Sequence, residues 1–286
     1  MDKKVLAGVG IGAVVALFLG GNAVASHIAK KEVDKAIADV SDVVGIEYKK
    51  VNQSLLGGGT TVKDVVITPV GTAEPIKVNQ VVLYDFDQKD DVPTYLNFAF
   101  EGISLNLATL NESGDNLAEL GYDNELSGDF STEYEYDEAK QVVRLKKIEV
   151  GAEDLGTIEM NMELANITMD QDTLASLPFS LLGAEFQNAK ITYRDDSFFE
   201  RIIESGAEAE GISVDDAKKE LIASLSGGEG DDALPQEFID EMTDFINDPD
   251  SFSMTFSPAE PVPFVSLSGA STPEDFIELL NVRFES

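Results

Sequence analysis

A run of 21 residues without a charge, Val5–Ala25, most constrains what this chain can fold into. A helix needs about 20 apolar residues to cross the hydrocarbon core of a membrane, because each residue adds about 1.5 Å along the helix axis. Lys3 and Lys4 precede the run, as basic residues do in both membrane anchors and secretory signal peptides. The run therefore predicts an uncleaved anchor or a signal peptide cleaved at the small residues Ala23–Ala25.

Two observations favour the uncleaved anchor. The helical pattern continues beyond Asn22 without a turn residue, and small residues extend past any single cleavage point. Under both interpretations the chain from Lys31 onward lies outside the cytoplasm. We therefore expect a single-pass membrane protein in which residues 1–29 form the membrane anchor (or uncleaved signal).

The charge balance of the chain is strongly acidic. Asp and Glu number 54 against 20 Lys and Arg, which gives a formal net charge of −34 and an isoelectric point near 4.1. This balance repels nucleic acid and anionic lipid headgroups, so we exclude a nucleic-acid partner. It suits a solvated extracytoplasmic surface, life in a saline medium, or a basic partner.

Several chemistries are excluded by the residues that the chain lacks. It has no cysteine, which excludes disulfides, thiolate catalysis and cysteine-based metal sites. Its one histidine, His27, stands at the expected membrane edge, so neither a Ser–His–Asp triad nor a histidine metal site can form. Tryptophan, which sugar-binding clefts use for stacking, is also absent and argues against a glycoside hydrolase.

Hydrophobic periodicity predicts an α+β fold with an N-terminal transmembrane helix, a long curved antiparallel β-sheet and C-terminal helices packed on the sheet. The first predicted domain covers residues 30–194 and consists of a helix over Lys30–Val44 followed by the sheet. The alternation of apolar residues changes parity at Lys146 and Lys147, which predicts a β-bulge there. Residues 195–286 predict a helical tail with one or two strands, packed on the same domain. The expected strands cover Ile46–Lys50, Thr60–Pro69, Ile76–Phe86, Tyr95–Leu107, Leu126–Tyr136, Val143–Val150, Ile158–Leu164, Phe186–Arg194 and Ser251–Phe256.

Start signals mark the helices of the tail. The first is expected over Ser197–Glu210, and the second runs to Leu225 after Ser213, which serves as its N-cap. Pro235 begins a third helix, and Thr272 caps the last one. Between these helices, residues 227–234 predict a mobile loop and PAEPVPF (residues 258–264) an extended linker.

Three stretches of the sequence resemble known envelope proteins. They are VGIEYKKVNQSLLGGGTTVKDVVITPV after the anchor, the hairpin EYEYDEAKQVVRLKKIEVGAEDLGTIEMNMEL, and the tail ITYRDDSFFERIIESGAEAEGISVDDAKKEL. They are similar to the YdgA-like bacterial inner-membrane proteins and, more distantly, to AsmA-like proteins. The resemblance implies a protein of the bacterial inner membrane whose sheet-based body lies in the periplasm. Its AsmA-like side implies handling of phospholipid on an apolar groove, and its YdgA-like side implies no settled activity.

Two acidic stretches are the candidates for a calcium loop. Asp85–Asp91 has Asp90 where such a loop needs glycine, and Leu96 stands at its closing position. Asp123–Tyr134 comes closer, but Tyr134 replaces the closing glutamate and the strand alternation contradicts a helix–loop–helix motif. The glycine run at residues 57–59 lacks the lysine of a phosphate-binding loop and predicts a hairpin turn. We therefore predict no catalytic, cofactor-binding or metal-binding residues.

Phenylalanines on the predicted tail helices allow two interpretations. They form ordinary core against the sheet, or they cover an apolar groove in which a lipid chain lies. We expect a membrane-anchored, non-enzymatic periplasmic protein that binds phospholipid or scaffolds envelope proteins. The alternative is a carboxylate-dependent or calcium-dependent envelope hydrolase, which requires a deep polar cleft with two facing carboxylates. The phenylalanines concerned are Phe198, Phe199, Phe238, Phe245 and Phe276.

Overall fold

The computed structural model describes residues 30–39, 41, 44–53, 59–69, 75–87, 94–109, 112–169, 183–226, 234–267, 269 and 272–286. The predicted anchor Val5–Ala25, most of the predicted turn at residues 57–59 and most of the predicted loop at residues 227–234 lie outside these ranges. Within them, no helix combines the length and the apolar composition that a membrane crossing requires. The end of the first acidic stretch, residues 88–91, also lies outside the described residues.

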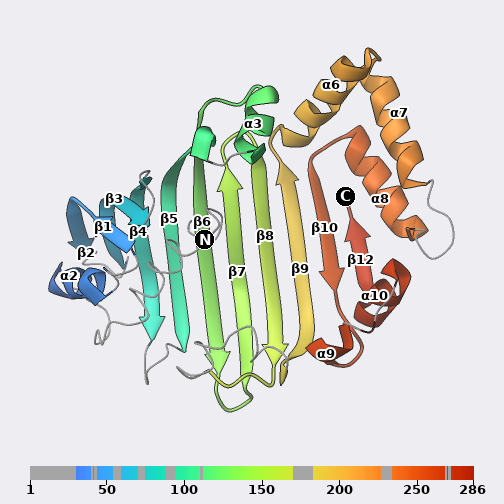
Figure 1. Ribbon diagram of the computed structural model, residues 1–286. Coiled ribbons are helices and arrows are strands. Elements are labelled where there is room, and N and C mark those ends of the chain that lie inside the picture. Colours follow the sequence, from blue (N-terminus) through green and yellow to red (C-terminus); the bar gives the residue numbers. More distant parts are fainter. Residues whose placement is uncertain are drawn as a thin grey trace. The chain divides into compact units, whose positions relative to one another are not determined.

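The chain divides into two compact units, Met1–Glu135 and Tyr136–Ser286 (Figure 1). The strands of each unit pair in antiparallel fashion, and the C-terminal helices pack on strands of the second unit. The α+β class and the antiparallel pairing predicted from the sequence are therefore confirmed. The division between the units falls inside a strand, whereas the predicted organisation places the end of the sheet domain at residue 194.

In the first unit the strands follow the order β1-β3-β4-β5-β6, and β2 pairs with the other part of β3. The helix α2 precedes the strands, and η1 and α3 connect β5 to β6. Every pairing between these described strands is antiparallel. The bounds are α2 Lys30–Asp39, β1 Val44–Glu47, β2 Lys50–Gln53, β3 Thr60–Pro69, β4 Ile76–Asp87, β5 Tyr95–Asn106, η1 Leu107–Thr109, α3 Glu112–Glu119 and β6 Glu125–Asp137.

The core of the first unit lies on one face of its sheet. Phe98 and Phe100 are each 1% exposed, and their rings meet edge to face with centroids 5.6 Å apart. Val33 of α2 joins the same cluster, because the apolar stripe of this short helix faces the sheet. The helix ends at Asp39, so the prediction that it extends to Val44 is wrong. Val44 is instead fully buried in β1, where it pairs with Pro69.

In the second unit the strand order is β7-β8-β9-β10-β12, and β11 pairs with the start of β9. The register of β7 on β8 shifts between Leu145 and Ile148, which confirms the predicted bulge at Lys146 and Lys147. The strand bounds are β7 Val142–Ala152, β8 Gly156–Ala165, β9 Glu185–Asp195, β10 Ser251–Phe256, β11 Val262–Pro263 and β12 Val282–Glu285. The helix bounds are α6 Phe198–Glu210, α7 Val214–Leu225, α8 Gln236–Asn247, α9 Phe264–Leu267 and α10 Pro273–Leu280.

The predicted start signals of the tail helices agree with the structure. The Ser213 hydroxyl accepts a hydrogen bond from the backbone N–H of Asp216, and Thr272 forms a reciprocal capping box with Asp275. Such caps satisfy backbone donors that the first turn of a helix leaves unpaired. The predicted extended linker is wrong in part, because it contains β11 and the start of α9. The strand β12 was not predicted.

Candidate functional site

In the second unit, one face of the sheet carries apolar residues in rows that run across the strands. Because side chains alternate along a strand, residues paired across neighbouring strands share a face. Pairing places Leu145 opposite Met162 and Met162 opposite Ala189, all three in one apolar cluster. The two adjacent rows on this face are Ile148, Met160, Ile191 and Met254, and Val150, Ile158, Tyr193 and Phe252.

Helices cover one end of these rows. Phe238 of α8 lies with its ring centroid 6.0 Å from that of Phe252 and 5.0 Å from that of Phe284. Phe245 of the same helix meets Tyr193 at 6.2 Å and is only 3% exposed. The apolar face of α8 is therefore packed over β9, β10 and β12.

The other end of the rows is open among the described residues. Val150 and Ile158 stand directly opposite each other on β7 and β8, and each is 50% exposed. Ile148, Met160 and Ile191 are half-buried in the next row. We call these five residues the apolar strip. It carries no charge and continues without interruption into the core beneath α8.

The turn at the open end is fixed by hydrogen bonds. The Tyr193 hydroxyl donates to the carbonyl of Leu155 at 3.0 Å, and the Ser197 hydroxyl donates to the carbonyl of Asp154 at 2.6 Å. Ser197 immediately precedes α6, so these bonds place the start of that helix beside the turn. Gly156 has a φ of 130°, which favours glycine, and a Cβ there would lie 2.3 Å from the carbonyl oxygen of Arg194. The edge of the apolar strip is therefore rigidly built.

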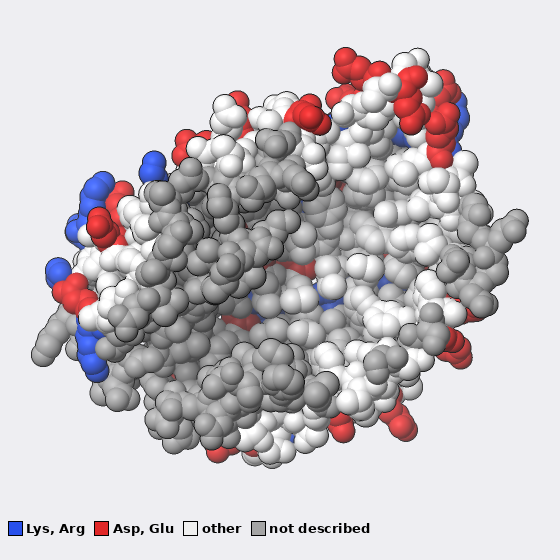
Figure 2. Space-filling model, viewed as in Figure 1, with Lys and Arg blue, Asp and Glu red and all other residues white. Residues whose placement is uncertain are grey.

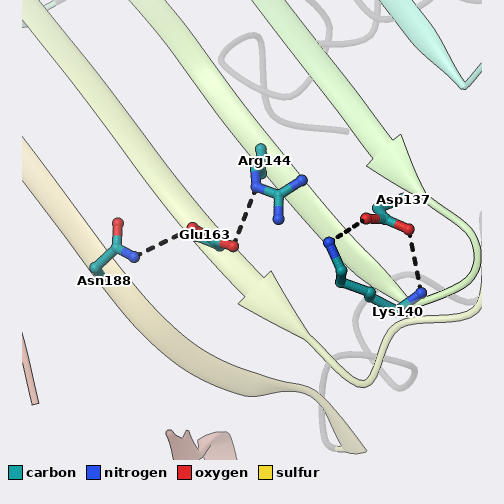
Figure 3. A network of polar contacts seen from close by, with 5 residues as sticks. All are labelled: Asp137, Lys140, Arg144, Glu163 and Asn188. Carbon is teal, nitrogen blue, oxygen red and sulfur yellow. Dashed lines mark hydrogen bonds and ion pairs between the residues drawn. The ribbon is translucent and has the colours of Figure 1, made fainter. Parts of the chain in front are cut away.

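The opposite face of the same sheet is polar. Arg144 on β7 donates from Nε to Glu163 on β8 at 3.1 Å, and Asn188 on β9 donates to the second oxygen of Glu163 at 3.3 Å (Figure 3). At the start of β7, Lys140 lies 3.0 Å from Asp137. The hydrogen bond from Lys140 holds the pKa of Asp137 below its ordinary value.

This polar network has a structural rather than a catalytic arrangement. Both oxygens of Glu163 accept hydrogen bonds, and Asp137 is stabilised in its ionised form. A general acid requires instead a carboxyl whose pKa burial has raised. Partly exposed pairs of this kind contribute at most about 1 kcal/mol each. The network therefore fixes the register of β7, β8 and β9 and makes this face of the sheet polar.

The predicted acidic stretches do not converge on a metal site in the described part of the chain. The structure places Asp85 and Asp87 at the end of β4, and Glu125–Asp137 forms the strand β6. No group of three or more His, Asp or Glu side chains suited to a metal ion occurs among the described residues. The strand alternation predicted through residues 123–134 is confirmed, because residues 125–134 lie in β6.

A surface cavity of about 690 Å³ lies against α10 and is lined by the segment Pro258–Pro263. Two carboxylates, Glu260 and Glu278, contribute to its lining, and both side chains are exposed. Both carboxylates are therefore in contact with water. A catalytic acid with a raised pKa requires instead that water be excluded from its carboxyl group.

The predicted phenylalanines divide between core and surface. Phe238 and Phe245 belong to the core under α8, and Phe199 packs on Phe245 with ring centroids 4.9 Å apart. Phe276 is 38% exposed on α10. Sequence reasoning did not single out the apolar strip, although the alternation of Ile158, Met160 and Met162 was recognised. Exposure alone distinguishes these residues from core, and it is a tertiary property.

The match with known protein families falls on this same unit. A family model described as "Uncharacterized protein" matches residues 149–286. The matched residues include four of the five residues of the apolar strip and all of the helices from α6 onward. No curated protein matches the chain.

Proposed function

We propose that this chain is a membrane-tethered, non-enzymatic protein on the periplasmic face of a bacterial inner membrane, where it binds lipid acyl chains on the apolar strip. The observation that carries the proposal is the Val150–Ile158 pair, half-exposed yet continuous with the core of the sheet. Contiguous apolar surface of this kind marks sites that bind lipid, small molecules or proteins.

The composition of the strip supports an acyl chain as its occupant. Its five side chains are aliphatic or thioether groups, which offer dispersion contacts and no hydrogen-bond donor or acceptor of consequence. A flexible methionine adapts its shape to chains of different length and unsaturation. The uncharged run Val5–Ala25 supports the tether, because it supplies the length needed to span a membrane and would keep the strip close to lipid.

The non-enzymatic part of the proposal is supported by the polar groups of the described residues. Glu163 has both oxygens engaged, and the carboxylates at the cavity beside α10 are exposed. The hydrolase alternative needs a desolvated acid that faces a second carboxylate.

The test is photocrosslinking of the full chain, reconstituted in lipid nanodiscs, with a phosphatidylethanolamine that carries a photoreactive group at the end of an acyl chain. We expect crosslinks on residues 148–160 and on Ile191. Val150→Asp combined with Ile158→Asp should lower this labelling by about tenfold or more, because burial of each side chain contributes on the order of 1 kcal/mol.

The matched control replaces two exposed valines outside the strip, Val214→Asp and Val265→Asp, which are 38% and 55% exposed. This control should leave the labelling of the strip unchanged. Labelling spread evenly over the exposed apolar residues, or unaffected by the aspartates in the strip, would refute lipid binding at this site. Crosslinks from the strip to another protein in cells would favour a scaffolding role instead.

A further inference from the structure

The charges of this acidic chain are segregated along its length. Residues 30–77 carry seven Lys and seven Asp or Glu, whereas residues 78–286 carry 11 Lys or Arg against 46 Asp or Glu. The net charge of −34 therefore comes almost entirely from residues 78–286. Figure 2 shows blue Lys and Arg atoms at the left of the view, where Figure 1 draws α2 and the first strands, with red Asp and Glu atoms among them. Residues 30–77 begin immediately after the predicted anchor.

Two lysines face each other directly in the β2–β3 ladder. Lys50 pairs with Lys63 in antiparallel register, and both side chains are exposed. Side chains in such a pair start about 5 Å apart, and like charges at that distance destabilise a sheet. Gln80, the partner of Lys63 on β4, donates to Glu101, the nearest carboxylate in that row. Among the described residues, the structure gives no ion pair for Lys50 or Lys63.

Further exposed lysines lie on α2 and beside the start of β2. Lys49, next to Lys50, reaches Asp64 only at 3.6 Å. On α2, Lys30 lies 5.3 Å from the ring centre of Tyr48, the residue before Lys49, and its ammonium group pairs with Asp34 at 2.8 Å. Lys35 on the same helix is exposed. We call Lys30, Lys35, Lys49, Lys50 and Lys63 the lysine patch.

We infer that the lysine patch binds the headgroups of anionic phospholipids in the membrane to which the chain is tethered. A directly opposed lysine pair reduces stability, so its charge needs a partner that the described residues do not supply. The patch lies within about 40 residues of the end of the predicted anchor, and lysines beside a membrane anchor are attracted to anionic lipid. The inference rests on the proposed tether and is independent of acyl-chain binding on the apolar strip.

The net acidity of the chain repels anionic lipid, but salt limits the distance over which this repulsion acts. At 0.1 M salt the Debye length is about 10 Å, so exposed carboxylates farther than this from the patch are largely screened. Local charge then decides the interaction with the membrane surface.

The test measures which lipids the full chain retains from nanodiscs of phosphatidylcholine that contain phosphatidylglycerol as a minor component. After partial removal of lipid, mass spectrometry gives the ratio of the two lipids bound to the protein. We expect phosphatidylglycerol to be enriched about fivefold or more over its share in the disc at low salt. The enrichment should fall strongly at 1 M salt, where the Debye length is about 3 Å.

The variant that removes the patch is Lys49→Gln with Lys50→Gln and Lys63→Gln, and it should abolish the enrichment. Replacement of the same three lysines by arginine keeps the charge and should keep the enrichment. If the glutamine variant fails to fold, the arginine variant still tests whether positive charge at these positions retains the lipid. Lack of enrichment in the unmodified chain, or equal enrichment in the glutamine variant, would overturn the inference.

A matched control removes the same charge from three exposed lysines of the second unit, Lys140→Gln, Lys146→Gln and Lys219→Gln. This control should retain the enrichment, and loss of enrichment in it would overturn the assignment to the patch. Acyl-chain crosslinking on the apolar strip should be unchanged in the patch variant. If headgroup binding by the lysine patch fails its test, acyl-chain binding on the apolar strip can therefore still be tested, and the reverse also holds.

Discussion

Replacing Ile158 by alanine should lower the free energy of unfolding by only about 1 kcal/mol. Ile158 is 50% exposed, so alanine removes about half of the 1.5–3 kcal/mol that full burial of such a side chain contributes, and it leaves no enclosed cavity. Leu164 lies on the same strand and the same face but is 5% exposed. Leu164→Ala should therefore cost about 2–5 kcal/mol, because a buried truncation adds a cavity term to the lost transfer energy.

The measurement is urea unfolding of the full chain in an uncharged detergent, monitored by far-ultraviolet circular dichroism. Both substitutions shorten an aliphatic side chain on β8. The β-branched isoleucine also loses strand propensity, which would reduce the expected difference and not create it. An equal loss of stability for Ile158→Ala and Leu164→Ala would mean that Ile158 is covered in the folded chain. That result would refute the open apolar strip and the lipid site proposed on it.

Three further substitutions follow from backbone geometry and charge. Gly156→Ala should destabilise the second unit by about 3 kcal/mol or more, because its φ is positive and the new Cβ would meet the Arg194 carbonyl at 2.3 Å. Gly206→Ala, inside α6 with open space around it, should instead stabilise by up to about 1 kcal/mol. Lys50→Glu should raise the free energy of unfolding by about 0.5 kcal/mol by turning the repulsion with Lys63 into attraction, and thermal unfolding of each variant checks all three.

Much of the local structure was predictable because its signals lie close together in the sequence. The β-rich run over Thr60–Pro69 predicts β3 with its observed bounds. The change of parity at Lys146 and Lys147 gave the bulge in β7, since one extra residue moves all following side chains to the other face. Capping residues gave the starts of α7 and α10.

The errors arose where a local pattern agreed with two structures. Val44 continues the helical spacing of the preceding apolar residues, but burial in β1 prevails over that spacing. The four residues Val282–Glu285 are too few to show a clear period, and β12 forms because it pairs with β10 and contacts α8.

The sequence by itself determined most of the longer elements, their antiparallel class and the charges they carry, since these depend on residues within a turn or a strand of one another. Only the tertiary structure decided which apolar residues are covered. Ile158 and Leu164 follow the same alternation on one strand, yet Leu164 is buried in the core of the second unit while Ile158 stays half-exposed. It also decided that Lys50 meets Lys63, because a cross-strand contact depends on register. The burial of a side chain and the register of paired strands depend on segments that are distant in the sequence. Local periodicity therefore does not predict them.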